Sequence, residues 1–396
     1  MMMRFLIAIL SWVQSSFIMR ILGVRAERRN AFLESRFFQG QPCKEPVTWF
    51  HAASLGELEM LKPLIEDFHA RGIKVGVSAF SDSALSGLKS LRSFAIFADL
   101  SPRENEWKRL FDRFNVNRLI LAKYDFWPGL LQASVKRNVP VIVINAQMRN
   151  SLLHMQRLFQ VLGEKFPKLT LFANDIVSLG ELKMNAGPDA ILLAGVDPRW
   201  ERVARRREEA KITPALKIWA EQIQKLAKPI GIVGSAWPSD LEKLLPAIKK
   251  TEDSLVVVPH DLNPENIREI KILIRENELT ERTVLVDEMG LLVELYAYAD
   301  WAFVGGGFGK GIHSLLEPVS FSIPVACGPQ RFRDFPETRE LSALGLVTRC
   351  ESTADISRWL GDKTKLQFDP KFISEKRAAY RALLEKCIET RGNLNS

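Results

Sequence analysis

The chain has 396 residues, enough for two or three domains, which argues against a single small binding module. Hydrophobic residues make up 46% and charged residues 26%, a composition that excludes a long disordered chain, a collagen-like protein and a polytopic membrane protein. The net charge of +8 indicates an anionic partner such as a nucleic acid, a membrane surface or a phosphorylated substrate. Its four cysteines are unclustered, so neither a disulfide framework nor a zinc site is expected, and a reducing compartment fits best.

The first segment, Met1 to Val24, is apolar with a polar break at Gln14, Ser15 and Ser16, and arginines follow it directly. It is too short and too interrupted for a transmembrane helix, and no small-residue cleavage site supports a signal peptide. We interpret residues 1–26 as an interfacial membrane anchor, with Trp12 at headgroup level and arginines on acidic lipid. A buried amphipathic first helix is the alternative.

Short aliphatic runs then alternate with helical patterns, which is typical of parallel sheets covered by helices on both faces. The first series of predicted strands is Val47–His51, Ile73–Ala79, Arg118–Ala122, Val139–Asn145 and Ile191–Ala194. The second series is Pro229–Gly234, Ser254–Pro259, Thr283–Val286, Asp300–Gly305 and Ile323–Gly328. The sequence therefore predicts two doubly wound α/β domains.

A charged helical stretch without strand-like runs, Arg199–Lys228, separates the two series. We expect a first domain over residues 27–204, a linker over 205–228 and a second domain over 229–368. A final helix within residues 369–396 is expected to pack back on the first domain. In such an arrangement a ligand cleft would lie between the carboxyl ends of the two sheets.

The densest motif is the glycine-rich segment from Gly305 to Gly311, which follows a predicted strand and runs into a helix. Glycine lets backbone N–H groups approach an anion, so the segment is a candidate phosphate cradle. It fits neither the Walker pattern, because Gly311 follows Lys310, nor the dinucleotide pattern Gly-x-Gly-x-x-Gly. A glycine-rich turn without a ligand is the structural alternative.

His313 and Glu317 follow that segment with i,i+4 spacing and would share a helix face. Glu317 could accept hydrogen bonds from two ribose hydroxyls while the loop holds a phosphate. A metal pair is the competing interpretation, but the chain has five histidines and no third ligand lies nearby in the sequence. We therefore predict no metal site.

A second motif is His51-Ala52-Ala53-Ser54-Leu55-Gly56-Glu57, which joins a predicted strand to a helix. Ser54 and Glu57 have the spacing of a capping box, which gives them a purely structural role. A carboxylate at the carboxyl edge of a sheet, held by backbone amides, stays ionised and could instead act as a general base. Spacing alone does not decide between the two roles.

A third strand-to-helix junction reads Lys123-Tyr124-Asp125-Phe126-Trp127-Pro128, with Pro128 near the helix start. Trp127 is better explained as a core residue than as a stacking platform. Arg149 follows the next strand and points to the same sheet edge. With Lys123 it could receive an anionic substrate, or both could be solvated surface charges.

Together these segments resemble the 3-deoxy-D-manno-octulosonic acid (Kdo) transferases of lipopolysaccharide synthesis, which are GT-B glycosyltransferases with two Rossmann-like domains. The resemblance covers nearly the whole chain. Its most specific residues are Met289-Gly290-Leu291-Leu292, Ala299-Asp300, Val304-Gly305-Gly306, His313-Ser314-Leu315-Leu316-Glu317 and Gly328-Pro329.

The resemblance implies that Glu57 is the catalytic base and that the donor is the activated sugar CMP-Kdo. It also implies donor contacts at Pro259-His260, Met289-Gly290-Leu291 and Ser314-Leu315-Leu316-Glu317. With the motifs described above, the predicted catalytic residues are Glu57, Lys123 and Arg199, and the predicted acceptor contacts are Ser54, Gly56, Asp125 and Arg149. The predicted donor-binding residues are Ser235, Pro259, His260, Met289, Gly290, Leu291, Gly305, Gly306, Gly307, Lys310, Gly311, His313, Ser314, Leu315, Leu316 and Glu317.

The sequence also departs from the family pattern. Lys123 stands where most members have a glutamate that is assigned to transition-state stabilisation, so that electrostatic role does not carry over. Arg199 falls near the position of a family lysine, His260 lies in a changed Pro-Arg-His-Pro motif, and Ser314 replaces an asparagine. These changes leave the fold expectation intact and bear on the identity of the acceptor.

The sequence thus predicts an inverting transfer of Kdo from CMP-Kdo to a lipid A precursor at the cytoplasmic face of the inner membrane. The expected partners are that donor, that acceptor and an anionic membrane surface, with no cofactor. Another GT-B transferase with a different nucleotide sugar, or a non-catalytic membrane-attached sugar-nucleotide-binding protein, is the alternative. Nucleic-acid binding is disfavoured because the basic residues are dispersed.

Overall fold

The computed structural model describes residues 43–79, 81, 84, 87–91, 96–99, 104–123, 125–208, 213–363, 369 and 371–390. The predicted membrane anchor over residues 1–26 lies outside these ranges. Within them, no helix combines the length and the apolar character needed to cross a membrane.

Contacts between residues divide the chain into two compact units. The first unit takes the residues up to Arg199 and those from Lys376 onward, and the second takes Trp200–Glu375. Each unit holds its own parallel sheet flanked by helices, so the predicted pair of Rossmann-like α/β domains is confirmed. Residues 205–228, predicted as a linker, contribute to two helices that group with the second unit.

The first unit contains, in its described residues, a sheet of seven parallel strands in the order β3-β2-β1-β4-β5-β6-β7. The strands are β1 (Cys43–Ala52), β2 (Lys74–Ala79), β3 (Ile96–Asp99), β4 (Phe114–Ala122), β5 (Val141–Ile144), β6 (Leu169–Ala173) and β7 (Ile191–Ala194). Its helices are α3 (Leu55–Ala70), α5 (Glu104–Arg113), α6 (Pro128–Lys136), α7 (Asn150–Val161) and α8 (Ile176–Asn185), with a 3₁₀ turn η1 (Leu88–Leu91).

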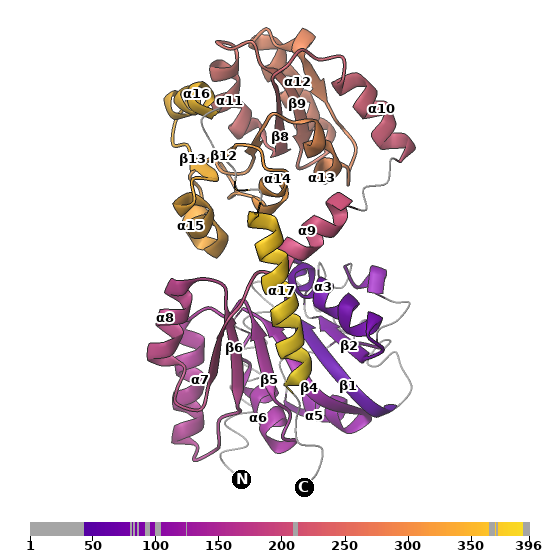
Figure 1. Ribbon diagram of the computed structural model, residues 1–396, viewed down its shortest axis with the longest axis vertical. Helices are drawn as coiled ribbons and strands as arrows, with labels where there is room; N and C mark the ends of the chain where they lie inside the picture. Colours follow the sequence, from indigo (N-terminus) through magenta and orange to yellow (C-terminus); the bar gives the residue numbers. More distant parts are fainter. Residues whose placement is uncertain are drawn as a thin grey trace. The chain divides into compact units, whose positions relative to one another are not determined.

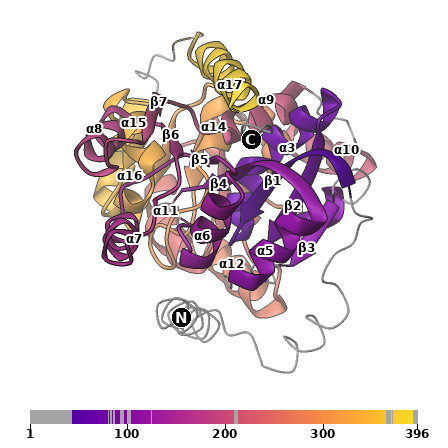
Figure 2. The same ribbon diagram turned by 90° about the horizontal axis from the view of Figure 1, so that it is seen from below.

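Helices cover both faces of the first sheet, as the nearly continuous apolar sequence of its central strands requires. A core of residues such as Trp49, Leu121 and Val143 packs against α5, α6, α7 and α8 on one face. The helix α17 (Phe372–Glu389) lies with α3 on the opposite face (Figure 2). There the buried guanidinium of Arg118 on β4 donates to the carbonyl oxygens of Cys387 and Ile388 at 2.7 Å each.

The second unit contains, over the ranges described, six parallel strands in the order β10-β9-β8-β11-β12-β13. They are β8 (Ile230–Ala236), β9 (Ser254–Pro259), β10 (Thr283–Leu285), β11 (Trp301–Val304), β12 (Val325–Cys327) and β13 (Val347–Arg349). The helices are α9 (Arg199–Glu208), α10 (Pro214–Ile223), α11 (Pro238–Ile248), α12 (Pro264–Glu276), α13 (Leu292–Leu295), α14 (Leu316–Ser320), α15 (Pro336–Ala343) and α16 (Thr353–Asp362). Three 3₁₀ turns are η2 (Thr280–Arg282), η3 (Tyr296–Tyr298) and η4 (Phe332–Asp334).

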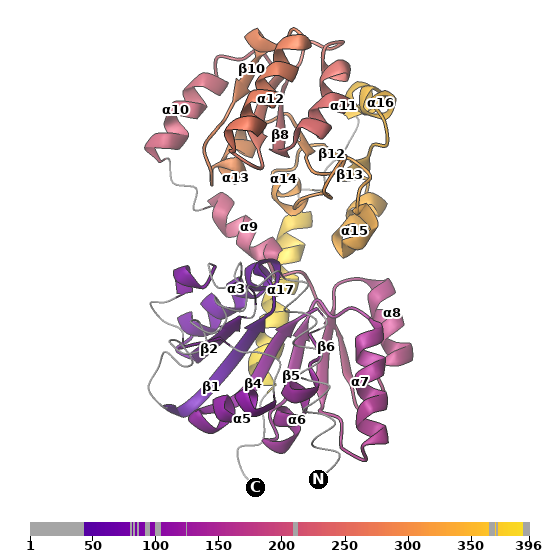
Figure 3. The same ribbon diagram turned by 180° about the vertical axis from the view of Figure 1, so that it is seen from behind.

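The core of the second unit packs α11, α12 and α16 against one face of this sheet, around Trp301, Phe303 and Val257. Helices α11 and α16 lie at one side of the unit, and α10 and α13 lie at the other (Figures 1 and 3). The second sheet is therefore also covered on both faces.

The two sheets share one feature of topology that positions functional residues. In each, the strand order reverses at the centre, between β1 and β4 in the first unit and between β8 and β11 in the second. At such a switch point the loops that follow the two strands diverge to opposite faces and leave a crevice, where ligands of this fold class bind.

All ten predicted strands are present in the structure. Three further strands, β3, β6 and β13, were not predicted from the sequence. Each of them has five residues or fewer, but so do predicted strands such as β5 and β12, so length alone does not explain why they were missed.

Candidate active site

The sequence-predicted residues fall into two groups, one at each switch point. In the first unit, Ser54 and Glu57 follow β1 while Lys123 and Asp125 follow its partner β4. In the second unit, Ser235 is the penultimate residue of β8 and the glycine-rich segment follows its partner β11. Residues far apart in the sequence are thus brought to the same sheet edge within each unit.

Glu57 lies in the first turn of α3, which begins with the predicted capping box. Its Oε2 accepts the amide hydrogen of Ala53 at 2.7 Å and that of Ser54 at 3.2 Å. The Ser54 hydroxyl in turn accepts the amide of Glu57 at 3.4 Å. Only 6% of Glu57 is exposed, so its carboxyl group is held in a fixed position at the edge of the sheet.

Asp125, predicted as an acceptor contact, lies against Glu57 and is itself buried. Burial raises the pKa of Asp125 well above its usual value, and the charge and hydrogen bond of Glu57 raise it further. The Ala53 amide and the Lys123 ammonium act in the opposite direction. The structure therefore places two carboxyl groups and one cation around a single point.

Lys123 has a left-handed backbone with φ of 63°, unusual for a residue other than glycine. Its amide donates to the Ile144 carbonyl at 2.8 Å, which anchors the end of β4 to β5. Backbone strain of this kind is concentrated at functional sites. It turns the chain where the half-buried Lys123 side chain is close enough for its charge to act on Asp125.

Arg199, predicted to be catalytic, is held by the buried carboxylate of Asp197. Its Nη2 lies 2.6 Å from Asp197 Oδ2, and its Nε lies 3.0 Å from Oδ1. The side-chain amide nitrogen of Asn145, the residue after β5, donates to the same Oδ2 at 3.4 Å. Asp197 thus fixes a guanidinium at the carboxyl edge of the first sheet, a role that sequence reasoning missed.

Other residues predicted for this edge have simpler positions. Arg149 is exposed at the start of α7, and Gly56 lies exposed in the first turn of α3. Trp127 is 6% exposed within the core, as predicted, and Pro128 begins α6.

In the second unit, the glycine-rich segment wraps around a carboxylate of the protein itself. Asp240, fully buried at the start of α11, accepts the amides of Gly306 at 2.7 Å, Phe308 at 3.1 Å and Trp237 at 3.0 Å. The amides of Gly309 and Gly311 donate to the carbonyl oxygen of Gly306.

This hydrogen bonding corrects one step of the sequence argument. The glycine-rich segment does bring amides to an anion, but for Gly306 and Phe308 that anion is Asp240. The glycines serve close packing: a Cβ on Gly305 would overlap the Ser235 carbonyl oxygen, and Gly306 has φ of 87°. A phosphate at this loop would need other donors, such as the Lys310 side chain.

A cluster of aromatic rings and one cation lies beside this loop. The rings of His260 and His313 stack with centroids 4.1 Å apart, and Trp237 lies 5.1 Å from His260. The Lys310 ammonium lies 3.7 Å from the Trp237 ring centroid, a cation–π contact. His260 and Lys310 are exposed, so this cluster offers a ring surface beside a positive charge.

Both histidines of the cluster are neutral at pH 7. Burial lowers the pKa of His313 to about 4, and the neighbouring His260 contributes. Burial also lowers the pKa of His260, with Lys310 adding to the effect and Asp261 opposing it. The neutral His313 accepts a hydrogen bond from the Trp237 indole at 3.4 Å.

The other residues that were predicted to bind the donor differ in how exposed they are. Met289 and Gly290 are exposed, and Arg206 donates to the Gly290 carbonyl at 2.6 Å. In contrast Leu291, Leu315 and Leu316 are buried and Pro259 ends β9, so any ligand contact there would be made by the backbone. Ser314 is half-buried next to His313.

Glu317 lies in the first turn of α14, whereas His313 precedes that helix, so the prediction that the two share a helix face was wrong. The charge of Glu317 acts on the Arg202 guanidinium and on the buried Tyr296 hydroxyl within the second unit. Over the described ranges, no three His, Cys, Asp or Glu side chains converge as a metal-binding group.

Sequence reasoning missed Trp237 and Asp240. Both follow a predicted strand, and Trp237-Pro238-Ser239-Asp240 has the proline and the acidic residue of a helix start. That signal could have located the helix. It could not have shown that Asp240 binds a loop 66 residues later in the chain.

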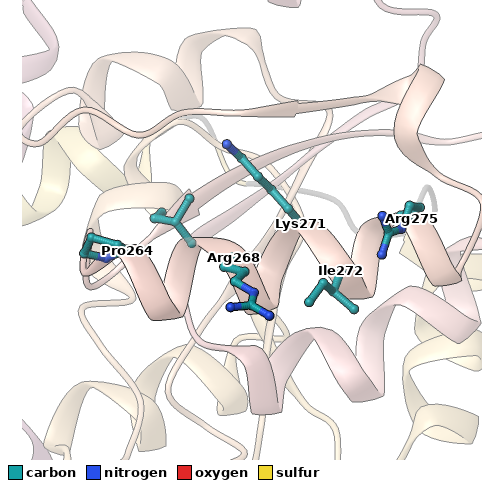
Figure 4. A pocket seen from close by; sticks show the side chains of 6 residues that line it. Pro264, Arg268, Lys271, Ile272 and Arg275 are labelled. Atoms are coloured by element: carbon teal, nitrogen blue, oxygen red, sulfur yellow. The ribbon is translucent and has the colours of Figure 1, made fainter.

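A depression of about 530 Å³ also lies on α12, away from the residues described above. It is lined by Pro264, Ile267, Arg268, Lys271, Ile272 and Arg275 (Figure 4). All six residues belong to one helix, so the depression is the space between neighbouring side chains. None is a predicted site residue, and we do not include it in the candidate site.

Comparison with known proteins identifies a family model and several proteins that are similar to this chain in sequence. Residues 25–175 match the sequence model of the 3-deoxy-D-manno-octulosonic-acid transferase (kdotransferase) family. A 3-deoxy-D-manno-octulosonic acid transferase of Aquifex aeolicus is 27% identical over 338 residues, which cover 80% of this chain and 87% of that protein. The enzyme of the same name from Haemophilus influenzae is 24% identical, covering 85% and 83%.

A bifunctional glycosyltransferase/methyltransferase of Fusobacterium nucleatum is 25% identical over 76% of this chain, and the chain spans 50% of its length. The fold recurs in a UDP-GlcNAc 2-epimerase of Neisseria meningitidis solved with UDP-GlcNAc. That structure has a TM-score of 0.61 and 19% identity over 87% of this chain and 100% of the other.

A glycosyltransferase structure from Rickettsia africae has a TM-score of 0.58 with 12% identity, and covers 87% of this chain and 95% of its own. At these identities the structural matches establish the fold alone, which is that of the GT-B class. The sequence matches extend the similarity to Kdo transferases over most of the chain.

Proposed function

We propose that the chain transfers Kdo from CMP-Kdo to a hydroxyl group of a lipid A precursor. The observation that carries the proposal is the buried Glu57 carboxylate, fixed by two backbone amides at the switch point of the first sheet. A capping box alone would not need that burial or a second carboxyl group beside it. The similarity to Kdo transferases supports the choice of Kdo and of a lipid acceptor.

In the proposed reaction Glu57 accepts the proton of the acceptor hydroxyl as the oxygen attacks the anomeric carbon of Kdo. The new bond joins the acceptor oxygen to that carbon, and the bond from the carbon to the CMP phosphate breaks. CMP leaves with the electron pair, and the stereochemistry inverts at the carbon that is attacked. Glu57 needs no metal to do this.

The proposed donor site is in the second unit. The ring surface of His260 and the Lys310 ammonium offer contacts for a base and a phosphate. Because both histidines are neutral, Lys310 is the cation of this cluster that can stabilise the charge on the departing phosphate. Glu317 is proposed to accept hydrogen bonds from the ribose.

The carboxylate of Kdo needs a cation of its own. Arg199 is the better candidate, because Asp197 fixes its guanidinium and a planar guanidinium can bind a carboxylate through two hydrogen bonds. The charge of Lys123 acts on Asp125, and we assign Lys123 to the charge balance of the Glu57–Asp125 pair. The acceptor phosphates would meet the exposed Arg149.

We also propose that the reaction takes place at the cytoplasmic face of the inner membrane. The lipid acceptor and the apolar residues 1–26 support this location. The positive net charge of the chain is suited to an anionic bilayer.

The test is transfer by the purified chain, with CMP-Kdo and a lipid A precursor as substrates and mass spectrometry of the lipid as readout. We expect a mass increase by whole Kdo units. Substituting Glu57→Gln should lower the rate by about 100-fold or more, the usual contribution of a general base. CMP-Kdo binding, measured by calorimetry, should stay unchanged.

Glu66→Gln is the matched control, because it makes the same chemical change later in α3. It should retain activity. Full turnover by the Glu57→Gln variant would contradict the assignment of the base. Transfer from UDP-GlcNAc but not from CMP-Kdo would favour the alternative of a different nucleotide sugar.

A further inference from the structure

Glu57 and Asp125 form a pair of buried carboxyl groups on neighbouring strands. Strands β1 and β4 are paired, Glu57 follows the first, and Asp125 lies three residues after the second. Their exposed fractions are 6% and 9%. Two negative charges so close together and so poorly solvated would repel each other strongly, so one of them must be neutralised.

The hydrogen bonds of the two carboxyl groups are unequal. Glu57 Oε2 accepts two backbone amides, which stabilise a carboxylate. Asp125 Oδ2 is fully buried, and no donor among the described residues reaches it. A buried carboxylate oxygen without a donor is strongly unfavourable, whereas a carboxylic acid supplies its own O–H.

The neighbours of Asp125 determine which of the two carboxyl groups holds the proton. The charged and titratable groups that act on Asp125 are Glu57 and Lys123, and the Ala53 amide also influences its carboxyl group. Burial and the Glu57 charge favour the neutral acid, and the Ala53 amide and Lys123 oppose it. The first two effects are the larger ones, so the pair holds one proton, which resides on Asp125.

We propose that Asp125 is a protonated carboxylic acid at neutral pH and donates its O–H to the Glu57 carboxylate. It is then a positioning residue: it orients the base and keeps the pair at a single negative charge. This inference rests on the proposed role of Glu57. It changes the assignment of Asp125 from an acceptor contact to a partner of the base.

The arrangement has a consequence for the proposed reaction. When Glu57 takes the proton of the acceptor hydroxyl, the pair passes from one proton and one negative charge to two protons and no charge. No second negative charge is ever buried, and the negative charge that the pair loses leaves with CMP. Deprotonation of Asp125 at high pH would remove the donor and add that second charge.

The direct test is infrared difference spectroscopy of the purified full chain as a function of pH, without substrate. At neutral pH we expect a carbonyl stretch of a protonated carboxyl group that is absent from the Asp125→Asn variant. Since this readout needs no turnover, it remains informative even if Glu57 is not the base. A spectrum in which the Asp125→Asn variant loses no such band would overturn the proposal.

A second variant keeps the proposal testable if Asp125→Asn does not fold. In Glu57→Gln the negative neighbour is gone, so the Asp125 band should disappear at a lower pH than in the wild type, by about one pH unit or more. An unchanged midpoint would contradict the hydrogen bond between the two groups. If Asp125 were instead ionised and paired with Lys123, the band would appear only in Lys123→Met, which would also overturn the proposal.

The activity profile separates positioning from a merely structural role. Asp125→Asn retains an N–H donor and should keep most activity at neutral pH while losing the fall in rate that Asp125 deprotonation causes at alkaline pH. Asp125→Ala has no donor and should lower kcat by about 10- to 100-fold, as expected for losing a hydrogen bond to a charged group.

Asp175→Asn is the control, since Asp175 is a half-buried carboxyl group that caps α8 at the same sheet edge. It should leave the band and the pH profile unchanged. Equal losses of activity in Asp125→Asn and Asp125→Ala, with an unshifted profile, would show that a hydrogen-bond donor at this position does not matter.

Discussion

At the scale of single residues, the second unit depends on one carboxylate. Asp240 binds three amides, and the glycine-rich segment takes its shape around it. Burial raises the pKa of Asp240, and the three amide hydrogen bonds oppose that rise. A motif that suggests a phosphate cradle in the sequence is thus partly an internal anion site in the structure.

This arrangement predicts that Asp240→Ala will destabilise the second unit. Three buried amides would lose their acceptor, and we expect the free energy of unfolding to fall by about 2–4 kcal/mol. Asp240→Asn keeps one acceptor oxygen and should lose about half as much. Urea denaturation followed by tryptophan fluorescence measures both changes.

The control for Asp240 is Asp287→Ala, which removes an exposed carboxylate from the same unit. Its midpoint should match that of the wild type. If Asp240→Ala were as stable as this control, the loop would be held by its own glycine geometry rather than by the carboxylate.

At the scale of helices and strands, prediction from sequence succeeded where a pattern was local. The central strands are apolar runs such as Val141–Ile144, and the capping box at Ser54 marks the start of α3. Prediction missed β6 and β13, and it missed Asp197, whose role depends on contacts with Arg199 and Asn145. Glu57 could be found as a candidate, but its pairing with Asp125 depends on the register of two strands.

Helix α17 is the element whose docking is most open to test. Arg118 is buried beneath it and binds the two carbonyl oxygens near its end, groups that a helix itself leaves unpaired. We expect Arg118→Met to lower the stability of the first unit by about 2–4 kcal/mol. Hydrogen exchange of the amides in α17 should speed up correspondingly.

Arg71 provides the comparison, because it also ties α17 to the first unit, through Glu385 at 2.6 Å. That ion pair is exposed and should contribute little. Arg71→Met is therefore expected to leave exchange in α17 almost unchanged. An effect as large as that of Arg118→Met would mean that the surface pair, not the buried guanidinium, holds the helix.

At the scale of the whole molecule, the two units share one strand order around their switch points. Each also contains a histidine that is kept neutral. Burial lowers the pKa of His51 in the first unit to about 3, against a weaker opposing effect of Ser78. Burial lowers that of His313 in the second unit to about 4.

These shifts predict that the protein loses stability in mild acid. In the unfolded chain His51 becomes protonated below about pH 6.5, the ordinary pKa of histidine. In the folded protein its pKa is about 3, so it stays neutral until the pH falls to that value. The contribution is complete above pH 6.5 and falls by about 1.4 kcal/mol per pH unit below it. Thermal unfolding of the first unit, measured between pH 7 and pH 4, should include this loss.

The slope should become shallower in His51→Gln, whatever the absolute stability of that variant. His69→Gln alters an exposed histidine of the same unit and serves as the control. An identical slope in the His51→Gln variant would assign the acid sensitivity to other groups.

The division of the first unit between two stretches of chain affects the order in which the protein is made. Arg118 leaves the ribosome 269 residues before Cys387, whose carbonyl oxygen it will bind. The second unit, by contrast, is one continuous stretch, Trp200–Glu375, and is synthesised in full before that partner appears. During translation the second unit can fold first, while in the unit that carries Glu57 one sheet face is covered only by α3 until α17 has been synthesised.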